Sequence, residues 1–589
     1  MTKRLLLAAA ALLPAAPAAA ADAPAPTAAR LSAAHAEPSV LSPAQRSAYR
    51  EIFAGIRAQD WTGAAAKLDG LPPGPLHPAA RAELYLAKGS PKVELDPLLT
   101  LIAAAPDMPQ APQLARLAET RGATELPPIP EAQKLIWVGE QPRRARARTT
   151  KADTAAVELE ALVQPMIKDD QPAAAESLLA ERELLLTPEA RTEFQQRIAW
   201  SHYLVGNDLA ARQLADKARL GTGEWALHAE WVAGLAAWRT KDCQAASDRF
   251  GTVAARSGDT EMAAAGHYWA ARADMMCGKP ERVQARLRNA ARLGETFYGL
   301  LASGALGIKG ANTAGLHNYR DDEWSRIAHK PNVKAAIALV EIGERSLADQ
   351  YIKHQVRIGD ARDHDALIHL ASDLSLASTQ FWLAHNAPRG ASVNFAARYP
   401  MPDWKPMRGW RVDRSLVFAH ALQESNFRTE AVSHAGAYGV MQVRPGTAGD
   451  IARARGDAFE RDYLADPAVN IEYGQSYLEY LRDDSGTSGL LPKVIAAYNA
   501  GPVPIAEWNT RQRDGGDPLL YIESIPYWET RGYVPIILRN YWIYEQQAGK
   551  ESASRKALSQ GLWPRFPGLP GAAGVRLNAQ PEGRGKGGD

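Results

Sequence analysis

The chain of 589 residues has few cysteines, almost no excess charge and few long hydrophobic runs. Its 68 Lys and Arg nearly balance 66 Asp and Glu, so the formal net charge is only +2. The chain therefore lacks the overall positive charge that would indicate nucleic-acid binding. Beyond the N-terminal segment, no apolar stretch is long enough to span a bilayer. We expect neither a nucleic-acid partner nor a membrane span, and the length predicts two or more domains.

The first residues have the order of a secretory signal peptide. "MTKRLLLAAAALLPAAPAAAADAPAP" begins with Lys3 and Arg4, continues with an apolar run and ends in small residues. This sequence of basic, apolar and small-residue regions is typical of exported proteins. We expect cleavage near Ala21, which makes residues 1–21 the signal peptide and places the mature protein in the periplasm.

The only two cysteines are Cys243 and Cys277. In an oxidising compartment they can form a disulfide, and they can equally be two buried thiols in neighbouring helices. The sequence does not distinguish a disulfide from two buried thiols. No histidine cluster surrounds either cysteine, which argues against a metal site.

Residues 40–390 are rich in alanine and show helical periodicity with short breaks. Segments such as "HAEWVAGLAAWRTKDCQAASDRFGTVAARSG" are typical of helix–turn–helix units. The two cysteines lie 34 residues apart, near the period of tetratricopeptide-type repeats. We therefore favour an α-superhelical domain over an irregular helical bundle and place it at residues 22–395.

Proline and basic residues interrupt this pattern, so we expect a loop or hinge around residues 125–153. The run "PRRARAR" within it can bind an anion or a nucleic acid, although such a short basic run is more often a solvated loop. Glycine, proline and tryptophan become frequent near residues 388–410, which predicts a second domain at residues 400–560. The glycine- and proline-rich residues 565–589 are expected to be a disordered tail.

Glu424 is an acid at the end of a mostly apolar helix. The stretch "DRSLVFAHALQ" predicts a short helix with Asp413 as its N-cap, and Leu416, His420 and Glu424 follow at i, i+4 and i+8. Burial disfavours a charged carboxylate and raises its pKa, as a general acid requires near neutral pH. An isolated glutamate at this position would be an ordinary surface residue, so a catalytic role for Glu424 depends on the neighbouring motifs.

The next motif, "SHAGAYGVMQVRPGTA", contains Gly436 and Gly439, which allow close approach of backbone or ligand. We expect "VMQV" to be a short extended piece and a helix to begin at Pro445 or Thr447.

Further along, "LLPKVIAAYNAGP" predicts a helix from Pro492 to Gly501. Tyr498 and Asn499 lie in the last turn of this helix.

Residues 405–545 resemble the catalytic domain of the soluble lytic transglycosylases. The resemblance rests on five motifs in the family's order: "ALQESNF", "SHAGAYGVMQVRPGTA", "NIEYGQSYL", "AAYNAGP" and "ESIPYWETRGYV". It implies a mainly α fold, in which an N-terminal α-superhelical domain precedes a lysozyme-like, mostly helical catalytic domain.

The resemblance also implies roles for individual residues. Glu424 matches the family's single catalytic acid/base, whereas Glu523 is more readily read as structural. Arg444 stands where the family pattern "MQ-x-MP" usually has a groove-lining methionine. The positions expected to bind substrate are Ser433, Met441, Gln442, Arg444, Tyr498, Asn499 and Glu529.

The implied reaction cleaves the MurNAc-β-1,4-GlcNAc bond of peptidoglycan and leaves 1,6-anhydroMurNAc ends, with Glu424 as general acid and then base. The expected partners are glycan strands and, through the helical domain, other cell-wall enzymes. No metal or cofactor is implied. One alternative is a lysozyme-type muramidase, which needs a second acid such as Glu529. Another is a helical scaffold that binds peptidoglycan without cutting it.

Overall fold

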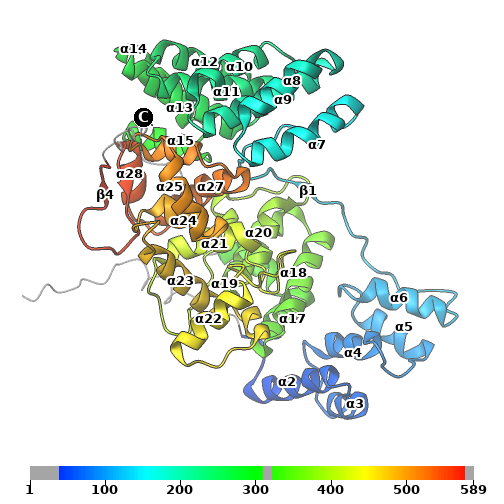
Figure 1. Ribbon diagram of the computed structural model, residues 1–589. Helices are drawn as coiled ribbons and strands as arrows, with labels where there is room; N and C mark the ends of the chain where they lie inside the picture. The colour runs from blue at the N-terminus through cyan, green and yellow to red at the C-terminus, as the bar shows by residue number, and fades with distance from the viewer. Residues whose placement is uncertain (1–38, 309–320, 578–589) are drawn as a thin grey trace, which may run out of the picture. The chain divides into compact units, whose positions relative to one another are not determined.

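The computed structural model describes residues 39–308 and 321–577, and it confirms the predicted mainly α-helical fold (Figure 1). Within the described residues, strands are limited to short pieces that pair as β1 with β2 and β3 with β4. No helix among them is long and apolar enough to cross a membrane. The predicted signal peptide, residues 1–21, lies outside the described residues.

One hydrophobic core joins the first helices of the described chain to those just before the second predicted domain. Asn332 donates a hydrogen bond of 2.7 Å to the carbonyl of Asp107 across this core. The elements concerned are α2 (Pro43–Arg57), α3 (Trp61–Asp69), α4 (His77–Leu86), α5 (Leu95–Ala104), α6 (Ala111–Thr120), α16 (Asp321–Ile327), α17 (Pro331–Ile342), α18 (Arg345–Ile358), η2 (Ala361–Asp363), α19 (His364–Asp373), α20 (Ala377–His385), β2 (Asn386–Ala387) and η3 (Phe395–Arg398).

A second core begins with a run of helices in which each packs against the next from α9 to α14. Alanine is frequent on the packed faces, as close helix pairing requires. These elements are α7 (Thr154–Lys168), α8 (Pro172–Arg182), η1 (Glu183–Leu185), α9 (Pro188–Leu204), α10 (Asp208–Ala218), α11 (Glu224–Arg239), α12 (Cys243–Arg256), α13 (Thr260–Met276), α14 (Pro280–Ala291) and α15 (Phe297–Ala305).

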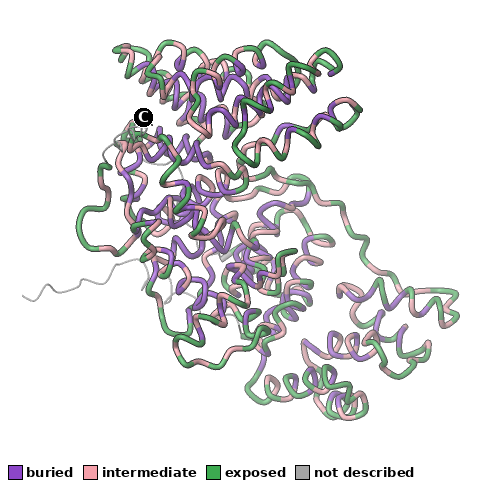
Figure 2. The backbone as a smooth tube through the Cα atoms, in the orientation of Figure 1, coloured by how far each residue is buried: buried purple, intermediate pink, exposed green. Residues whose placement is uncertain are grey.

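The same second core continues into the C-terminal helices. Most residues of α21 and α27 are buried, and the two helices pack against each other (Figure 2). These elements are α21 (Arg414–Ser425), α22 (Pro445–Arg455), η4 (Arg461–Ala465), α23 (Pro467–Asp483), α24 (Leu491–Ala500), α25 (Pro502–Arg511), α26 (Pro518–Glu523), α27 (Trp528–Gln547), α28 (Ala553–Ser559), β3 (Trp563–Pro564) and β4 (Gly574–Val575).

The segment predicted as a loop or hinge, residues 125–153, contains no helix. Its strand β1 (Ile136–Trp137) pairs antiparallel with β2. Arg144 in this loop forms a two-pronged ion pair with Glu523 of α26, with distances of 2.6 and 2.7 Å. The loop is therefore attached to the C-terminal helices by a charged contact.

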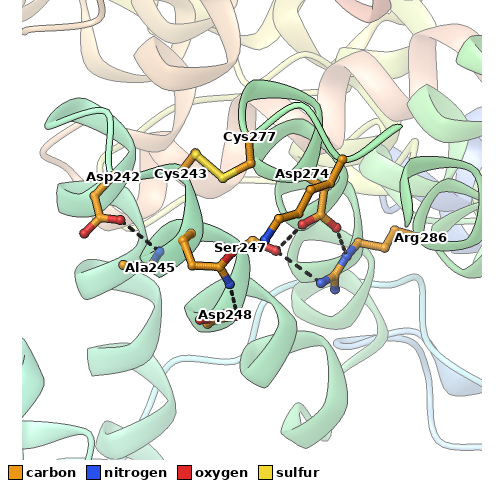
Figure 3. Close-up of a disulfide and its surroundings, with 10 residues drawn as sticks. Asp242, Cys243, Ala245, Ser247, Asp248, Asp274, Cys277 and Arg286 are labelled. Carbon is orange, nitrogen blue, oxygen red and sulfur yellow. Dashed lines mark hydrogen bonds and ion pairs between the residues drawn. A yellow bond between two sulfur atoms is a disulfide. The ribbon is translucent and has the colours of Figure 1, made fainter. Parts of the chain in front are cut away.

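Cys243 and Cys277 form a disulfide, which settles the alternative that the sequence left open (Figure 3). Cys243 begins α12 and Cys277 caps the end of α13, so the bond joins neighbouring helices. Asp274 lies nearby and accepts hydrogen bonds of 2.5 Å from both Ser247 and Arg286.

The structure differs from the prediction of a disordered tail from residue 565 onward. Phe566 is buried, and β4 pairs with β3 through Trp563 and Val575. Burial of these apolar side chains outweighs the glycine- and proline-rich composition up to residue 577. Residues 578–589 lie outside the described chain.

Candidate active site

Helix α21 positions Glu424. Asp413 caps its first turn as predicted, because its carboxylate accepts a hydrogen bond of 2.8 Å from the backbone of Ser415. Asn426 ends the helix in the left-handed region, with φ at 52°. Leu416 is fully buried, whereas Glu424 at the other end of the stripe is partly exposed.

Glu424 has a single described hydrogen-bond partner, Tyr533 of α27. The Tyr533 hydroxyl donates to Oε1 of Glu424 over 2.5 Å. Burial raises the pKa of Glu424 to about 7, and the nearby charge of Glu529 acts in the same direction. The hydrogen bond from Tyr533 opposes this rise because it stabilises the ionised form. Near neutral pH, Glu424 can therefore both donate and accept a proton.

His420, Tyr498 and Tyr533 form a cluster of rings, of which Tyr533 contacts the Glu424 carboxyl. The ring centroids of His420 and Tyr498 are 4.7 Å apart, and that of Tyr533 lies 6.1 Å from His420. Burial lowers the pKa of His420 to about 4, so the imidazole is neutral, and it lies 2.9 Å from the carbonyl of Leu416. Burial also raises the pKa of both tyrosines well above its ordinary value, which keeps their hydroxyls protonated.

The loop after α21 folds back on itself through paired bridges of Val432 with Tyr438 and of Tyr438 with Val443. The piece "VMQV", predicted as extended, is instead a turn. Gly439, directly before this piece, begins the turn at a φ of 72°, and a Cβ there would collide with Asn470. The reason for the error is that the Asn470 amide holds this turn by bonding the carbonyl of Tyr438.

Ser433 and Gln442, which the sequence predicts to bind substrate, both lie on this loop. The hydroxyl oxygen of Ser433 accepts a hydrogen bond of 3.0 Å from the backbone of Ala437. The side-chain nitrogen of Gln442 donates to the carbonyls of Ala431 and Gly439, at 3.1 and 2.9 Å. Both side chains are therefore fixed in place, while the hydroxyl hydrogen of Ser433 and Oε1 of Gln442 have no described partner.

The side chain of Met441, which the sequence predicts to bind substrate, is fully buried against Gly474. Its backbone carbonyl instead accepts a hydrogen bond of 2.8 Å from the Tyr498 hydroxyl and so positions that ring. Arg444 is exposed at the N-terminus of α22 and has no ion-pair partner among the described residues.

Of the remaining acidic and amide residues, Asn499 and Glu523 bond neighbouring elements, whereas Glu529 is exposed. Asn499 accepts a hydrogen bond of 2.6 Å from Thr530 and so links α24 to α27. Glu529 is exposed in the first turn of α27. Glu523 is buried in its ion pair and accepts a further hydrogen bond of 2.5 Å from Tyr298, which fits the structural reading.

The sequence-based reading named neither Tyr533 nor His420 as a site residue. Tyr533 stands four residues after Glu529 in "ETRGYV", so the helical spacing could have placed both near one groove. His420 was placed on the stripe of Glu424, but nothing in the sequence showed that aromatic rings surround it.

Solved structures share this fold, in which a helical superhelix precedes a helical domain. The 70-kDa soluble lytic transglycosylase of Escherichia coli matches with a TM-score of 0.54 over 89% of this chain and 99% of that chain, at 17% identity. An inactive mutant of lytic transglycosylase Slt from Pseudomonas aeruginosa matches with a TM-score of 0.52, covering 86% and 82% at 20% identity. The fold is thus a helical superhelix with a lysozyme-like domain.

The sequence comparisons match the C-terminal part of the chain. Residues 404–520 match the model described as "Transglycosylase SLT domain". The soluble lytic murein transglycosylase of Salmonella typhimurium is 34% identical over 160 residues, which cover 27% of this chain and 24% of that protein. A putative soluble lytic murein transglycosylase of Haemophilus influenzae is 27% identical, with 36% of each covered.

These matches confirm the predicted resemblance to the soluble lytic transglycosylases over residues 404–520, which match the transglycosylase SLT domain model. In sequence, the match to the Salmonella and Escherichia coli relatives spans about a quarter of their length.

Proposed function

We propose that the protein is an exported lytic transglycosylase that cleaves peptidoglycan between MurNAc and GlcNAc and leaves 1,6-anhydroMurNAc ends. The observation that carries the proposal is Glu424, which lies within the residues matched by the SLT model and whose partial burial raises the pKa of its carboxyl to about 7. The names of the relatives, soluble lytic murein transglycosylases, support the same reaction.

Glu424 would act twice in the reaction. Protonated, it would donate to the glycosidic oxygen as the bond to GlcNAc breaks. Ionised, it would accept the proton of the muramic 6-hydroxyl as that oxygen bonds to C1. A pKa near 7 suits both steps, because neither protonation state is strongly disfavoured at neutral pH. The attacking hydroxyl belongs to the substrate, so the step gains the advantage of an intramolecular reaction.

The surrounding residues would position the sugar. Tyr533 would stabilise the ionised carboxylate after the first proton transfer. Ser433 and Gln442 would bind polar groups of the glycan, Tyr498 would lie against the reacting ring, and Asn499 would fix the edge of the groove. These roles rest on their placement around Glu424 and on the match of the motifs.

Hydrolysis remains the second candidate, favoured by one observation: the charge of Glu529 is close enough to raise the pKa of Glu424. A hydrolase of this kind would need Glu529 as the second carboxylate that activates water. Glu529 is exposed on α27 rather than held by described partners, so we favour the single-carboxylate reaction.

We assign residues 22–395 to an α-superhelical domain that guides glycan strands or contacts other cell-wall enzymes, and 400–560 to the catalytic domain. Cleavage near Ala21 would release the mature protein into the periplasm. The oxidising periplasm is consistent with the Cys243–Cys277 disulfide.

The decisive experiment is mass spectrometry of the soluble products released from purified sacculi. Wild type is expected to give anhydromuropeptides, and Glu424→Gln to give none. Glu430→Gln, which changes an exposed glutamate six residues further on, is the matched control and should retain activity. Reducing-end muropeptides from wild type would favour the muramidase, and no product from folded wild type would reject enzymatic cleavage.

A further inference from the structure

A cavity outside the candidate active site lies between the helical region and the start of α27. Its volume is about 290 Å³, at the lower end of the range typical for small-molecule sites. Its walls come from the loop at residues 144–147, from α7, α9, α11 and α13, and from residues 526–531. The Arg144–Glu523 ion pair fixes the loop, and a hydrogen bond of 2.9 Å between Tyr203 and Ser524 joins the two sides.

Tryptophan dominates the apolar part of this wall. Trp200, Trp225, Trp231 and Trp528 all line the cavity, and of these Trp231 is nearly buried. The His228 ring lies 5.9 Å from that of Trp225 and 6.0 Å from that of Trp528, so it continues the same aromatic surface. Burial lowers the pKa of His228 to about 4, which leaves it neutral. Such a surface suits a ligand with flat, partly apolar faces, such as a sugar ring.

The polar part of the wall is cationic: it contains four arginines and no acidic side chain. Arg144 is neutralised by Glu523, and Arg197 by Glu160 at 2.5 Å. The other two have no ion pair within the described chain. Arg531 donates to the carbonyl of Ile525 over 2.9 Å and lies over Trp200, 4.1 Å from the ring centroid.

Arg146, the fourth arginine, is exposed at the cavity and has no described hydrogen bond. It belongs to the run "PRRARAR", for which the sequence allows an anion or nucleic-acid site as well as a solvated loop. Burial lowers the pKa of Arg531 to about 10, so it also remains charged at neutral pH. Two unpaired guanidinium groups beside aromatic faces suit a carboxylate, which arginine can bind in a planar, two-pronged geometry.

We propose that this tryptophan–arginine cavity is a second binding site, which takes a carboxylate-bearing muropeptide with its sugar against the tryptophans and a carboxylate on Arg146 and Arg531. The cavity itself supports an acidic, ring-bearing ligand; its identity as a muropeptide rests on the proposed function. The reaction proposed above would produce this class of molecule.

The cavity and the active site share the first turn of α27. Trp528 lines the cavity, and the next residue, Glu529, acts on the pKa of Glu424. One turn further along, Tyr533 donates to Glu424. A muropeptide in the cavity would therefore contact the helical turn that carries the neighbours of the catalytic carboxyl.

The test uses the full-length Glu424→Gln protein, which does not consume its ligand. Isothermal titration with a purified disaccharide-tetrapeptide is expected to show two binding sites. Adding Arg146→Glu or Trp225→Ala should weaken one site at least tenfold and leave the other unchanged. Arg143→Glu is the matched control: Arg143 is exposed, lies three residues away and does not line the cavity, so both sites should persist.

A neutral chitotetraose provides the second arm, because it lacks a carboxylate. It should bind the catalytic groove only, and equally well in all four proteins. The indole N–H of Trp225 donates a hydrogen bond to the carbonyl of Arg148, so a melting curve must show that Trp225→Ala is folded. Arg146 has no described hydrogen bond or ion pair, so Arg146→Glu removes no such contact. One muropeptide site unaffected by either substitution would overturn the proposal, and so would chitotetraose binding that falls with them.

The binding result is separable from the proposed function. If wild type releases no anhydromuropeptides but the cavity variants lose a muropeptide site, the transglycosylase proposal fails and the binding site stands. If anhydromuropeptides form and titration shows one site that neither substitution affects, the transglycosylase proposal stands and the second binding site fails.

Discussion

The hydroxyl of Tyr533 donates a hydrogen bond of 2.5 Å to Oε1 of Glu424, joining the end of α21 to the first half of α27. These residues are 109 positions apart in the sequence. The bond opposes the effect of burial on the pKa of Glu424. Tyr533 therefore lowers the pH at which the Glu424 carboxyl loses its proton.

Tyr533→Phe should move the alkaline limb of the pH profile of kcat/KM upward by about one pH unit. In wild type, activity should fall above pH 7, because a general acid with a pKa of about 7 is then increasingly ionised. Without the hydrogen bond the ionised form is less stable, so the pKa rises and the protonated form persists to higher pH.

The pH profile of anhydromuropeptide release measures this shift. Tyr527→Phe is the control, because Tyr527 is an exposed tyrosine at the start of the same helix. An alkaline limb that stays at its wild-type position in Tyr533→Phe would contradict the role given to the hydrogen bond.

Glu424→Gln should stabilise the protein more at pH 8 than at pH 5. The folded-state pKa of Glu424 is raised from 4.5 to about 7, so ionisation disfavours the folded state. The stability that the carboxyl contributes is fully present below pH 4.5 and is lost as the pH rises through 7. Glutamine does not ionise, so the difference should approach about 3 kcal/mol at pH 8.

Thermal melting of wild type and variant across this pH range tests the sign. Glu430→Gln controls for the loss of one negative charge on an exposed residue. A Glu424→Gln protein whose melting temperature follows that of wild type at every pH would rule out a buried, poorly solvated carboxyl.

The contact between Tyr533 and Glu424 shows where sequence-based prediction reached its limit. Local signals predicted α21, because Asp413 caps it, and α24, because Gly501 ends it. The motif resemblance placed Tyr498 near Glu424. It did not reveal Tyr533, because that contact depends on how α27 packs against α21.

The same distinction explains the errors. The apolar turn around Met441 was read as extended because nothing local shows that Asn470 holds it. The buried side chain of Met441 follows from this turn. The tail was read as disordered because its composition gives no sign that Phe566 packs into the core.

Removing the Cys243–Cys277 disulfide should lower the free energy of unfolding by about 3 kcal/mol. The bond closes a loop with a sequence separation of 34 residues, which restricts the unfolded chain. Cys243→Ser with Cys277→Ser should melt at a lower temperature than wild type. Reductant should lower the wild-type melting temperature to that of the double variant and leave the variant unchanged. Equal melting temperatures for all samples would argue against the bond.

Arg144→Met should destabilise the protein more than the double change of Arg144→Met with Glu523→Gln. The single change leaves the carboxylate of Glu523 buried without its cation, at a cost of about 3–5 kcal/mol. The double change also removes the buried charge, so part of the loss should be recovered, while Tyr298 can still bond the new amide. Thermal melting compares the stability of the two variants. A double variant that melts at a lower temperature than the single one would refute the prediction.

Arg444→Met should raise KM for peptide-bearing glycan and leave kcat nearly unchanged. Arg444 is exposed at the N-terminus of α22, has no described ion pair and acts on Tyr477 through its charge. It is too exposed to affect proton transfer by Glu424, but it can attract the carboxylates of stem peptides. Exposed charge pairs contribute up to about 1 kcal/mol, so KM should rise about three- to fivefold at low salt.

Methionine at this position restores the family pattern, so the fold should tolerate it. Arg453→Met is the control, because Arg453 is exposed on the same helix, α22, and is already paired with Asp450. The effect on KM should disappear at high salt, where exposed charges are screened, and on glycan stripped of its peptides. An equal rise in KM for stripped glycan would mean that Arg444 contacts the sugar chain instead of the peptides.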